Sequence, residues 1–189
     1  MLRFVALVAL ALSTATLAHA QDANTIKQRA AEIQKWRTTF ADQDPTVRLA
    51  ALEAVTRGKD PSLRAIAIDA ALKTSDTGLL AAALIRIFAG MRTIVIEPTG
   101  KGLLLTLAIS KFDPATGSFQ AAGVFRPQSG PGVSQCGSNL PTIQGQLTGL
   151  AIQFADNVCM GTLKFRDGRF VGTVSLTGQQ PFEGSFPVQ

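Results

Sequence analysis

The chain has 189 residues, a formal net charge of +5, two cysteines, one histidine and no tyrosine. The only histidine, His19, lies in an N-terminal segment that is typical of a removable export signal. We therefore expect a mature chain without a histidine general base, a histidine-dependent triad or a histidine metal site. The mild positive charge forms no run interleaved with aromatic residues, which argues against nucleic-acid binding.

Residues 1–20 are interpreted as a signal peptide. Arg3 supplies the basic start, an apolar run extends from Phe4 to Leu12, and Ala18-His19-Ala20 forms a small-x-small cleavage site. That run is too short to span a bilayer, which requires about twenty residues. The apolar stretch at 79–96 is interrupted by charged residues. We expect no transmembrane segment after signal removal, and a periplasmic or secreted protein.

The mature chain changes its periodicity near Gly90. Over residues 21–90 alanine, leucine and isoleucine recur at helical spacing, whereas over residues 92–189 glycine is frequent and apolar residues alternate. The pattern predicts an α+β protein. We expect an N-terminal antiparallel helical stack, followed by a small antiparallel β-barrel or curved sandwich of about eight strands.

A short motif repeats in the helical part. Asp44-Pro45-Thr46-Val47-Arg48 and Asp60-Pro61-Ser62-Leu63-Arg64 lie 16 residues apart, and a degenerate copy begins at Asp76. Aspartate is a favourable N-cap, and proline is favourable at the first helical position. The motif therefore predicts where each helix begins.

Residues 44–54, with the form Asp-Pro-x-Val-Arg-x-x-Ala-Leu-Glu-Ala, resemble HEAT-like repeats of the bacterial type. The resemblance covers about two helices, and the repeat is about half as long as a HEAT-like repeat. It implies a protein-binding scaffold. The alternative is that these are well-capped helices that pack only on the barrel or on each other. The candidate partner residues of the helical part are Trp36, Arg37, Arg48 and Arg64.

The second half carries a recurring apolar-x-Gly-x-apolar phrase. Alternation places each glycine on the same face as its apolar neighbours, where it allows a strand to coil tightly. This favours a small closed barrel or a strongly curved sandwich over a flat sheet. In general form it resembles small exported barrels of the avidin or lipocalin kind, although no family hallmark is present. The candidate interior residues are Phe119, Phe125, Phe154, Phe165, Phe170 and Phe182.

Eight strands are predicted in this half. Their bounds are Thr93 to Glu97, Gly102 to Ser110, Ser118 to Phe125, Thr142 to Leu147, Leu150 to Ala155, Val158 to Arg166, Arg169 to Leu176 and Phe182 to Val188. Turn residues separate them, which predicts an antiparallel meander built mostly of hairpins.

Two cysteines, Cys136 and Cys159, remain after signal removal. In an oxidising compartment they allow one intramolecular pairing, and we expect a structural disulfide. The alternative, a redox or nucleophilic thiol, has neither a CxxC spacing nor a nearby base. The bond would hold one end of the irregular stretch 126–141, which is either a contact loop or a tolerated insertion. The candidate loop residues are Gln128, Ser134 and Asn139.

No catalytic motif is evident. A pair of carboxylates could serve a glycosidase, but most acidic residues of the second half lie in predicted turns, where aspartate bonds its own backbone. A nucleophile elbow, a calcium loop and a dinucleotide fingerprint are absent from the sequence. We therefore predict a protein that is not an enzyme, with no cofactor and no metal.

The first functional hypothesis is an exported, non-catalytic interaction protein that recognises an envelope or extracellular macromolecule, namely an unknown protein or another envelope component. The first alternative is a calycin-like carrier that holds a small apolar ligand inside the barrel. The second alternative is an inhibitor of an envelope hydrolase that acts through the loop around Cys136.

Overall fold

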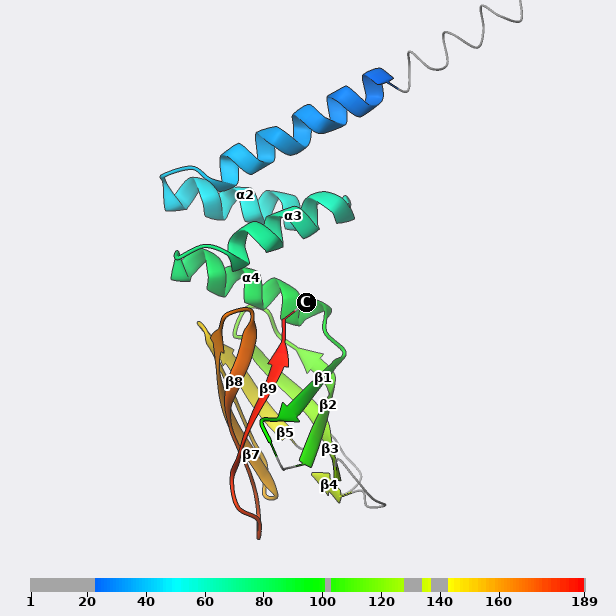
Figure 1. The fold of residues 1–189 in the computed structure, drawn as a ribbon, viewed down its shortest axis with the longest axis vertical. Coiled ribbons are helices and arrows are strands. Elements are labelled where there is room, and N and C mark those ends of the chain that lie inside the picture. Colours follow the sequence, from blue (N-terminus) through cyan, green and yellow to red (C-terminus); the bar gives the residue numbers. More distant parts are fainter. Residues whose placement is uncertain (1–22, 101–102, 128–133, 137–142, 189) are drawn as a thin grey trace, which may run out of the picture. The chain divides into compact units, whose positions relative to one another are not determined.

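The computed structural model describes residues 23–100, 103–127, 134–136 and 143–188, with the backbone alone at 127 and 134–136. The predicted signal peptide lies outside these residues. The chain divides into two compact units, Met1–Ala67 and Ile68–Gln189 (Figure 1). The first is helical. The second contains the end of one helix, a further helix and all the strands.

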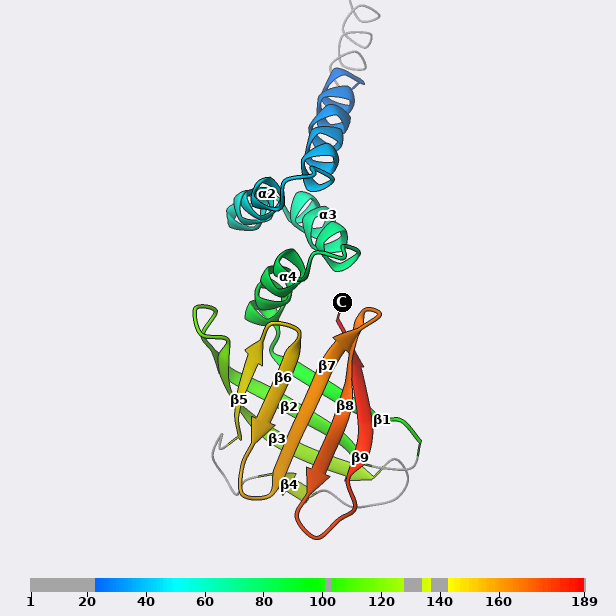
Figure 2. The same cartoon turned by 90° about the vertical axis from the view of Figure 1, so that its left-hand side faces the viewer.

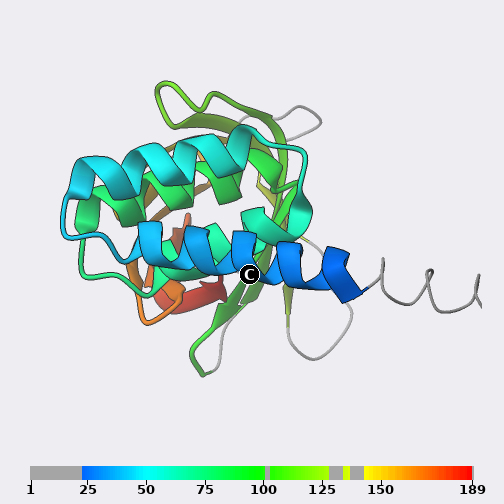
Figure 3. The same cartoon turned by 90° about the horizontal axis from the view of Figure 1, so that it is seen from above.

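The helices are those of residues 23–40, α2 (Pro45–Arg57), α3 (Pro61–Leu72) and α4 (Thr77–Gly90). Figure 3 shows the short loop between the helix of residues 23–40 and α2. Each of the three repeat aspartates caps the helix that follows it. The helix starts predicted from the repeat are confirmed. Among the described residues, no helix is both long and apolar enough to cross a membrane.

The N-caps are made by side-chain oxygens. Asp44 Oδ1 accepts from the backbone N–H of Thr46 at 2.8 Å, and Asp60 Oδ1 accepts from those of Ser62 and Leu63 at 2.9 and 3.1 Å. These bonds satisfy amide groups that have no partner within the helix. The start of each helix is therefore set by a few neighbouring residues.

The second unit contains nine strands. They are β1 (Thr93–Pro98), β2 (Leu103–Phe112), β3 (Ser118–Pro127), β4 (Ser134–Cys136), β5 (Ile143–Thr148), β6 (Ala151–Ala155), β7 (Cys159–Arg166), β8 (Arg169–Leu176) and β9 (Phe182–Pro187). The strands pair antiparallel in a meander, β4 adds to β3 alone, and β1 pairs with β9. Eight strands thus form a closed barrel (Figure 2), which confirms the α+β class and decides for the barrel over the curved sandwich.

The strand predictions differ from the structure in one element. β4 lies within the stretch predicted to be irregular, and it pairs with residues 123–125 of β3. A three-residue strand has too little periodicity to be recognised locally. The change from helix to strand falls between Gly90 and Thr93, while the division into compact units falls earlier, after Ala67.

Helix α4 packs on the barrel through its apolar face. Leu80, Leu84 and Phe88 belong to the same buried cluster as the inward side chains of the strands. The ring of Phe88 lies 6.0 Å from that of Phe119 and 6.2 Å from that of Phe170, measured between centroids. Because α4 shares the core of the barrel, the strands that it contacts are held by a helix as well as by their hydrogen bonds.

Candidate functional site

The predicted interior phenylalanines occupy the inside of the barrel. Phe119, Phe125, Phe154, Phe165 and Phe170 are buried, and Phe182 is partly buried against the same core. Three of these positions form ring contacts with one another or with neighbouring phenylalanines, including a stacked pair between Phe170 and Phe186.

One inward row alternates rings with glycines. Phe119 lies opposite Gly145, which lies opposite Phe154, which lies opposite Gly161. A Cβ atom added at Gly145 would collide with the Phe119 ring, and one added at Gly161 would collide with the Phe154 ring. Each ring therefore occupies the space that the neighbouring glycine leaves, so the predicted inward glycines make room for the protein's own side chains.

A groove of about 710 Å³ lies on the outer face of the same strands. Figure 2 shows β5, β6, β7 and β8 side by side, and β3 follows β5 in the sheet. The groove is lined by Lys111, Asp113, Ser118, Phe119, Gln120, Gln144, Gly145, Gln146, Gln153, Phe154, Ala155, Met160, Gly161, Thr162, Thr173 and Ser175. Because successive residues of a strand face opposite sides, the inward members of this set contribute backbone to the floor of the groove.

The outward lining residues form two rows that run across the strands. The first row contains, from β3 to β8, Ser118, Gln146, Gln153, Thr162 and Thr173. The second row contains Gln120, Gln144, Ala155, Met160 and Ser175. The inward row of rings and glycines lies between them. The groove thus has two walls of mostly polar side chains and a floor of backbone.

Sheet geometry determines the size of this arrangement. Neighbouring strands lie about 4.8 Å apart, so a row across five strands is about 19 Å long. The two rows are two residues apart along each strand, which corresponds to about 7 Å. The site is therefore a narrow channel that is much longer than it is wide.

One end of the first row is held by a turn. Gln146 Nε2 donates to the backbone oxygen of Thr116 at 3.1 Å, and the Thr116 and Ser118 hydroxyls lie 2.8 Å apart. The pKa of Asp113 lies below its ordinary value, first because the backbone N–H of Ala115 donates to it and then because the Thr116 hydroxyl does. The ionised form of Asp113 is therefore favoured in the turn. The hydrogen bond from Gln146 to Thr116 orients the Gln146 side chain before a ligand binds.

The rest of the groove keeps its hydrogen-bonding groups available. Among the described residues, the side chains of Gln120, Gln144, Gln153, Thr162 and Thr173 make no hydrogen bond within the chain. All five are exposed. An amide offers donors and an acceptor, and a hydroxyl offers both. These groups can therefore bond to a ligand without breaking any contact of the described fold.

The groove is nearly neutral. Lys111 and Asp113 are the ionisable residues of its lining, they carry opposite charges, and both lie beside β3 at the end of the site. The lining contributed by β5, β6, β7 and β8 is uncharged. Within the described residues, no group of three or more His, Cys, Asp or Glu side chains could hold a metal ion. The arrangement can bind through hydrogen bonds and contact area.

The predicted arginines of the helical part make bonds within their own loops. Arg48 Nη1 donates to the backbone oxygens of Asp42 and Gln43 at 2.6 and 3.0 Å, and Arg64 Nη2 donates to that of Gly58 at 2.8 Å. In both copies of the repeat the arginine thus reaches back to the residues that precede its own helix. This gives the arginine of the repeat a structural explanation.

The two predicted partner residues before α2, one aromatic and one basic, differ in exposure. Trp36 is partly buried and its ring stacks on that of Phe40 at 6.1 Å between centroids, whereas Arg37 is exposed. In the predicted loop, Gln128 and Asn139 lie outside the described residues, and Ser134 is described by its backbone in β4. The contact role of these residues stays a prediction.

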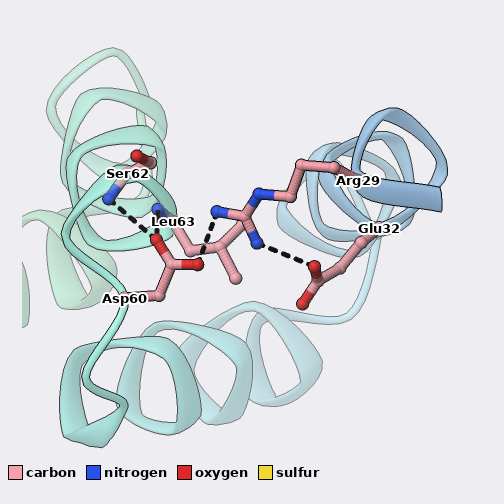
Figure 4. A network of polar contacts seen from close by, with 5 residues as sticks. All are labelled: Arg29, Glu32, Asp60, Ser62 and Leu63. Carbon is pink, nitrogen blue, oxygen red and sulfur yellow. Dashed lines mark hydrogen bonds and ion pairs between the residues drawn. The ribbon is translucent and has the colours of Figure 1, made fainter. Parts of the chain in front are cut away.

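An ion-pair network that the sequence did not suggest joins two helices of the first unit (Figure 4). Arg29 Nη1 donates to Glu32 Oε2 at 2.7 Å, and Arg29 Nη2 lies 2.5 Å from Asp60 Oδ2. The pKa of Asp60 is lowered, first by the backbone N–H of Leu63 and also by the Arg29 guanidinium. The pKa of Arg29 is raised by its bonds to Glu32 and Asp60. The network links the helix of residues 23–40 to the start of α3.

Cys159 is buried at the start of β7, and its backbone N–H donates to Asp156 Oδ1 at 2.6 Å. The side chain of Cys136 lies outside the described residues, so the disulfide stays a prediction.

Sequence reasoning missed the glutamines of the groove. Its available signal was glutamine at alternating positions of two neighbouring predicted strands, with Gln144 and Gln146 in one and Gln153 in the next. That pattern indicates a polar face on each strand, but it does not indicate which residues of the two strands lie opposite each other.

Comparison with protein-family models, with curated proteins and with solved structures finds no match to this chain. We therefore infer the function from the barrel and from the geometry of its outer groove.

Proposed function

We propose that the protein is an exported, non-catalytic binding protein that holds an envelope or extracellular macromolecule in the outer groove of its barrel. One observation carries the proposal: two ordered rows of outward side chains, most of them amides and hydroxyls with hydrogen-bonding groups available, line a groove of about 710 Å³. Polar side chains on paired strands keep fixed spacing, which favours recognition of a ligand with regular structure.

The packing of the barrel interior supports an outer site. An eight-stranded barrel is just wide enough to be filled by side chains or to hold one small ligand. Here the inward positions are occupied by buried aliphatic and aromatic residues, and each ring of the Phe/Gly row rests on a glycine. This packing weighs against the carrier hypothesis and leaves the outer face as the better candidate.

The shape of the groove favours a macromolecule over a small molecule. Two parallel rows about 19 Å long, with their Cα positions about 7 Å apart along each strand, suit an extended chain. Each neutral hydrogen bond contributes only about 1 kcal/mol net, so useful affinity requires several of them along the ligand. A polymer supplies such repeated contacts.

The test is retention of the mature chain, residues 21–189, on insoluble or immobilised envelope components. A panel of purified peptidoglycan sacculi, lipopolysaccharide and an immobilised extended polypeptide is assayed by co-sedimentation or surface binding. We expect one polymer of the panel to retain the protein. That polymer should be recovered with its own chain length unchanged, as expected for binding without cleavage. The double substitution Gln153→Ala with Thr162→Ala should weaken retention at least tenfold, since it removes two hydrogen-bonding side chains of the first row.

The matched control is Thr148→Ala with Gln179→Ala. It changes the same residue types at exposed positions of the second unit that do not line the groove. We expect this control to bind as the unaltered protein does. Equal loss in both doubles, or no loss in either, would contradict the proposal, as would degradation of the retained polymer.

A further inference from the structure

The spacing and chemistry of the two rows narrow the class of ligand. Sugar hydroxyls donate and accept hydrogen bonds at once, as the amides and hydroxyls of the rows do. A polyanion or polycation would find no opposite charge along β5, β6, β7 and β8, where the lining is uncharged. The chemistry of the walls therefore favours a neutral, hydroxyl-rich chain.

The repeat of the rows separates a glycan from a peptide. Row positions recur once per strand, at about 4.8 Å. An extended β-1,4-linked pyranose chain advances by close to this length with each sugar and turns consecutive sugars over. Each strand can therefore meet one sugar, alternately by its opposite edges. An extended peptide advances about 3.4 Å per residue and presents the same face every second residue, at about 6.8 Å. The side chains on one face of the peptide therefore lose their alignment with the row positions within a few strands.

The walls also differ in a way that suits a sugar ring. The first row is polar throughout, whereas the second row places Ala155 and Met160 in its middle. Met160 is 58% exposed, and its thioether is a flexible apolar surface. A pyranose laid along the channel can direct hydroxyls to Gln153 and Thr162 while its C–H face contacts Met160.

From these observations we infer that the groove binds a neutral, extended β-linked glycan, with one sugar unit per strand. The inference rests on the proposed function and specifies its ligand. The outward lining has no exposed aromatic ring on which a sugar could stack, so each unit contributes little by itself. Affinity should increase with each added sugar until the row of five strands is filled, and then level off.

The experiment titrates the mature chain with β-1,4-linked N-acetylglucosamine oligomers of two to six units, followed by calorimetry and by NMR of side-chain amides. Three further probes test the argument: maltohexaose, which is neutral but α-linked and coiled; hyaluronan oligomers, which are β-linked but charged; and a neutral extended peptide of serine and glycine. We expect affinity that increases up to about five units, one for each strand of the row. The three further probes should bind at least tenfold more weakly.

The side-chain amide resonances of the groove glutamines give a readout on the unaltered protein. We expect those of Gln144 and Gln153 to shift on titration, while that of Gln179, outside the groove, does not. The double substitution Gln144→Ala with Gln153→Ala should reduce affinity for the hexamer at least tenfold but leave the thermal unfolding midpoint nearly unchanged. Thr148→Ala with Gln179→Ala is the control.

The outcomes separate the inference from the function on which it rests. Equal binding of α- and β-linked chains, tighter binding of the peptide or hyaluronan, or no dependence on length would overturn the glycan inference. If the envelope panel still showed groove-dependent retention, the proposed function would stand. If neither the panel nor the oligomers bound through the groove, both would fall.

Discussion

In the helical unit each repeat helix begins at an aspartate that caps it, and an arginine four residues later bonds the preceding loop. In the barrel, by contrast, strands that are distant in the sequence meet across an interior of rings and aliphatic side chains. The helix starts thus depend on exposed polar contacts between near neighbours, while the unit also buries apolar residues such as Leu52 and Ala67. The barrel depends on buried contacts between distant residues.

The buried interior of the barrel indicates where substitutions should be tolerated. Among the described residues, no polar or charged residue is buried. The inward face of the barrel is therefore apolar, and its outward face carries many exposed polar side chains whose loss opens no cavity. A rigid interior can hold the two outer rows at constant spacing, which is what recognition of a regular polymer requires.

The largest effect should follow from removing an interior ring. We expect Phe154→Ala to lower the free energy of unfolding of the barrel by about 3–5 kcal/mol, because a buried ring is lost and a cavity remains over Gly161. Urea denaturation followed by the β-sheet circular dichroism signal measures this. Phe182→Ala, at a partly buried position, should cost clearly less. Equal costs would mean that the interior row has no special role.

A smaller effect should follow from filling a glycine of the same row. Gly161→Ala places a methyl group against the Phe154 ring, and we expect a loss of about 1–3 kcal/mol in unfolding free energy from overpacking. Gly90→Ala is the control, because a Cβ there meets no heavy atom within 4 Å. If neither substitution changed the unfolding free energy, the Phe154 ring would have room to move. The interior would then be less tightly packed than the contacts indicate.

The helical unit should respond to acid through Asp60. Its pKa in the folded chain is below the ordinary value, so the ionised form is favoured by folding. The resulting stabilisation is present above the ordinary pKa and is lost as the pH falls through the lowered one. Asp60→Asn should make the helical circular dichroism signal less dependent on pH in that acidic range.

Asp113→Asn is the control for this measurement, because its lowered pKa belongs to a turn of the barrel unit. It should leave the acid response of the helical signal unchanged. A helical signal that responds to acid identically in the Asp60→Asn and unaltered proteins would show that the network of Figure 4 does not stabilise the unit.

The smallest effect on stability should come from the outer face. Thr162→Val keeps the β-branched shape of an exposed strand residue, so the unfolding free energy should change by no more than about 0.5 kcal/mol. Binding of a groove ligand should nevertheless weaken about fivefold, as expected for the loss of one hydrogen bond. Thr148→Val is the exposed control outside the lining. A large stability loss at Thr162 would contradict the separation of the two faces.

Much of the local structure was predictable from the sequence. Asp44, Asp60 and Asp76 mark the helix starts, because an N-cap is an interaction between residues two or three positions apart. Seven strands end within two or three residues of their predicted bounds and β8 agrees at both ends, since alternation is a property of consecutive residues. Inward placement of Gly145 and Gly161 follows from the same alternation.

Barrel closure and the groove were decided by the tertiary structure alone. Closure requires Glu97 and Pro98 to pair with Ser185 and Gly184, which are almost ninety positions away. The groove exists because Gln146, Gln153 and Thr162 come from three strands whose registers bring them opposite one another. A shift of one residue in a single strand would turn its row member inward. Composition and periodicity report what each strand contains, whereas the pairing between strands is a long-range property that appears only when the chain is folded.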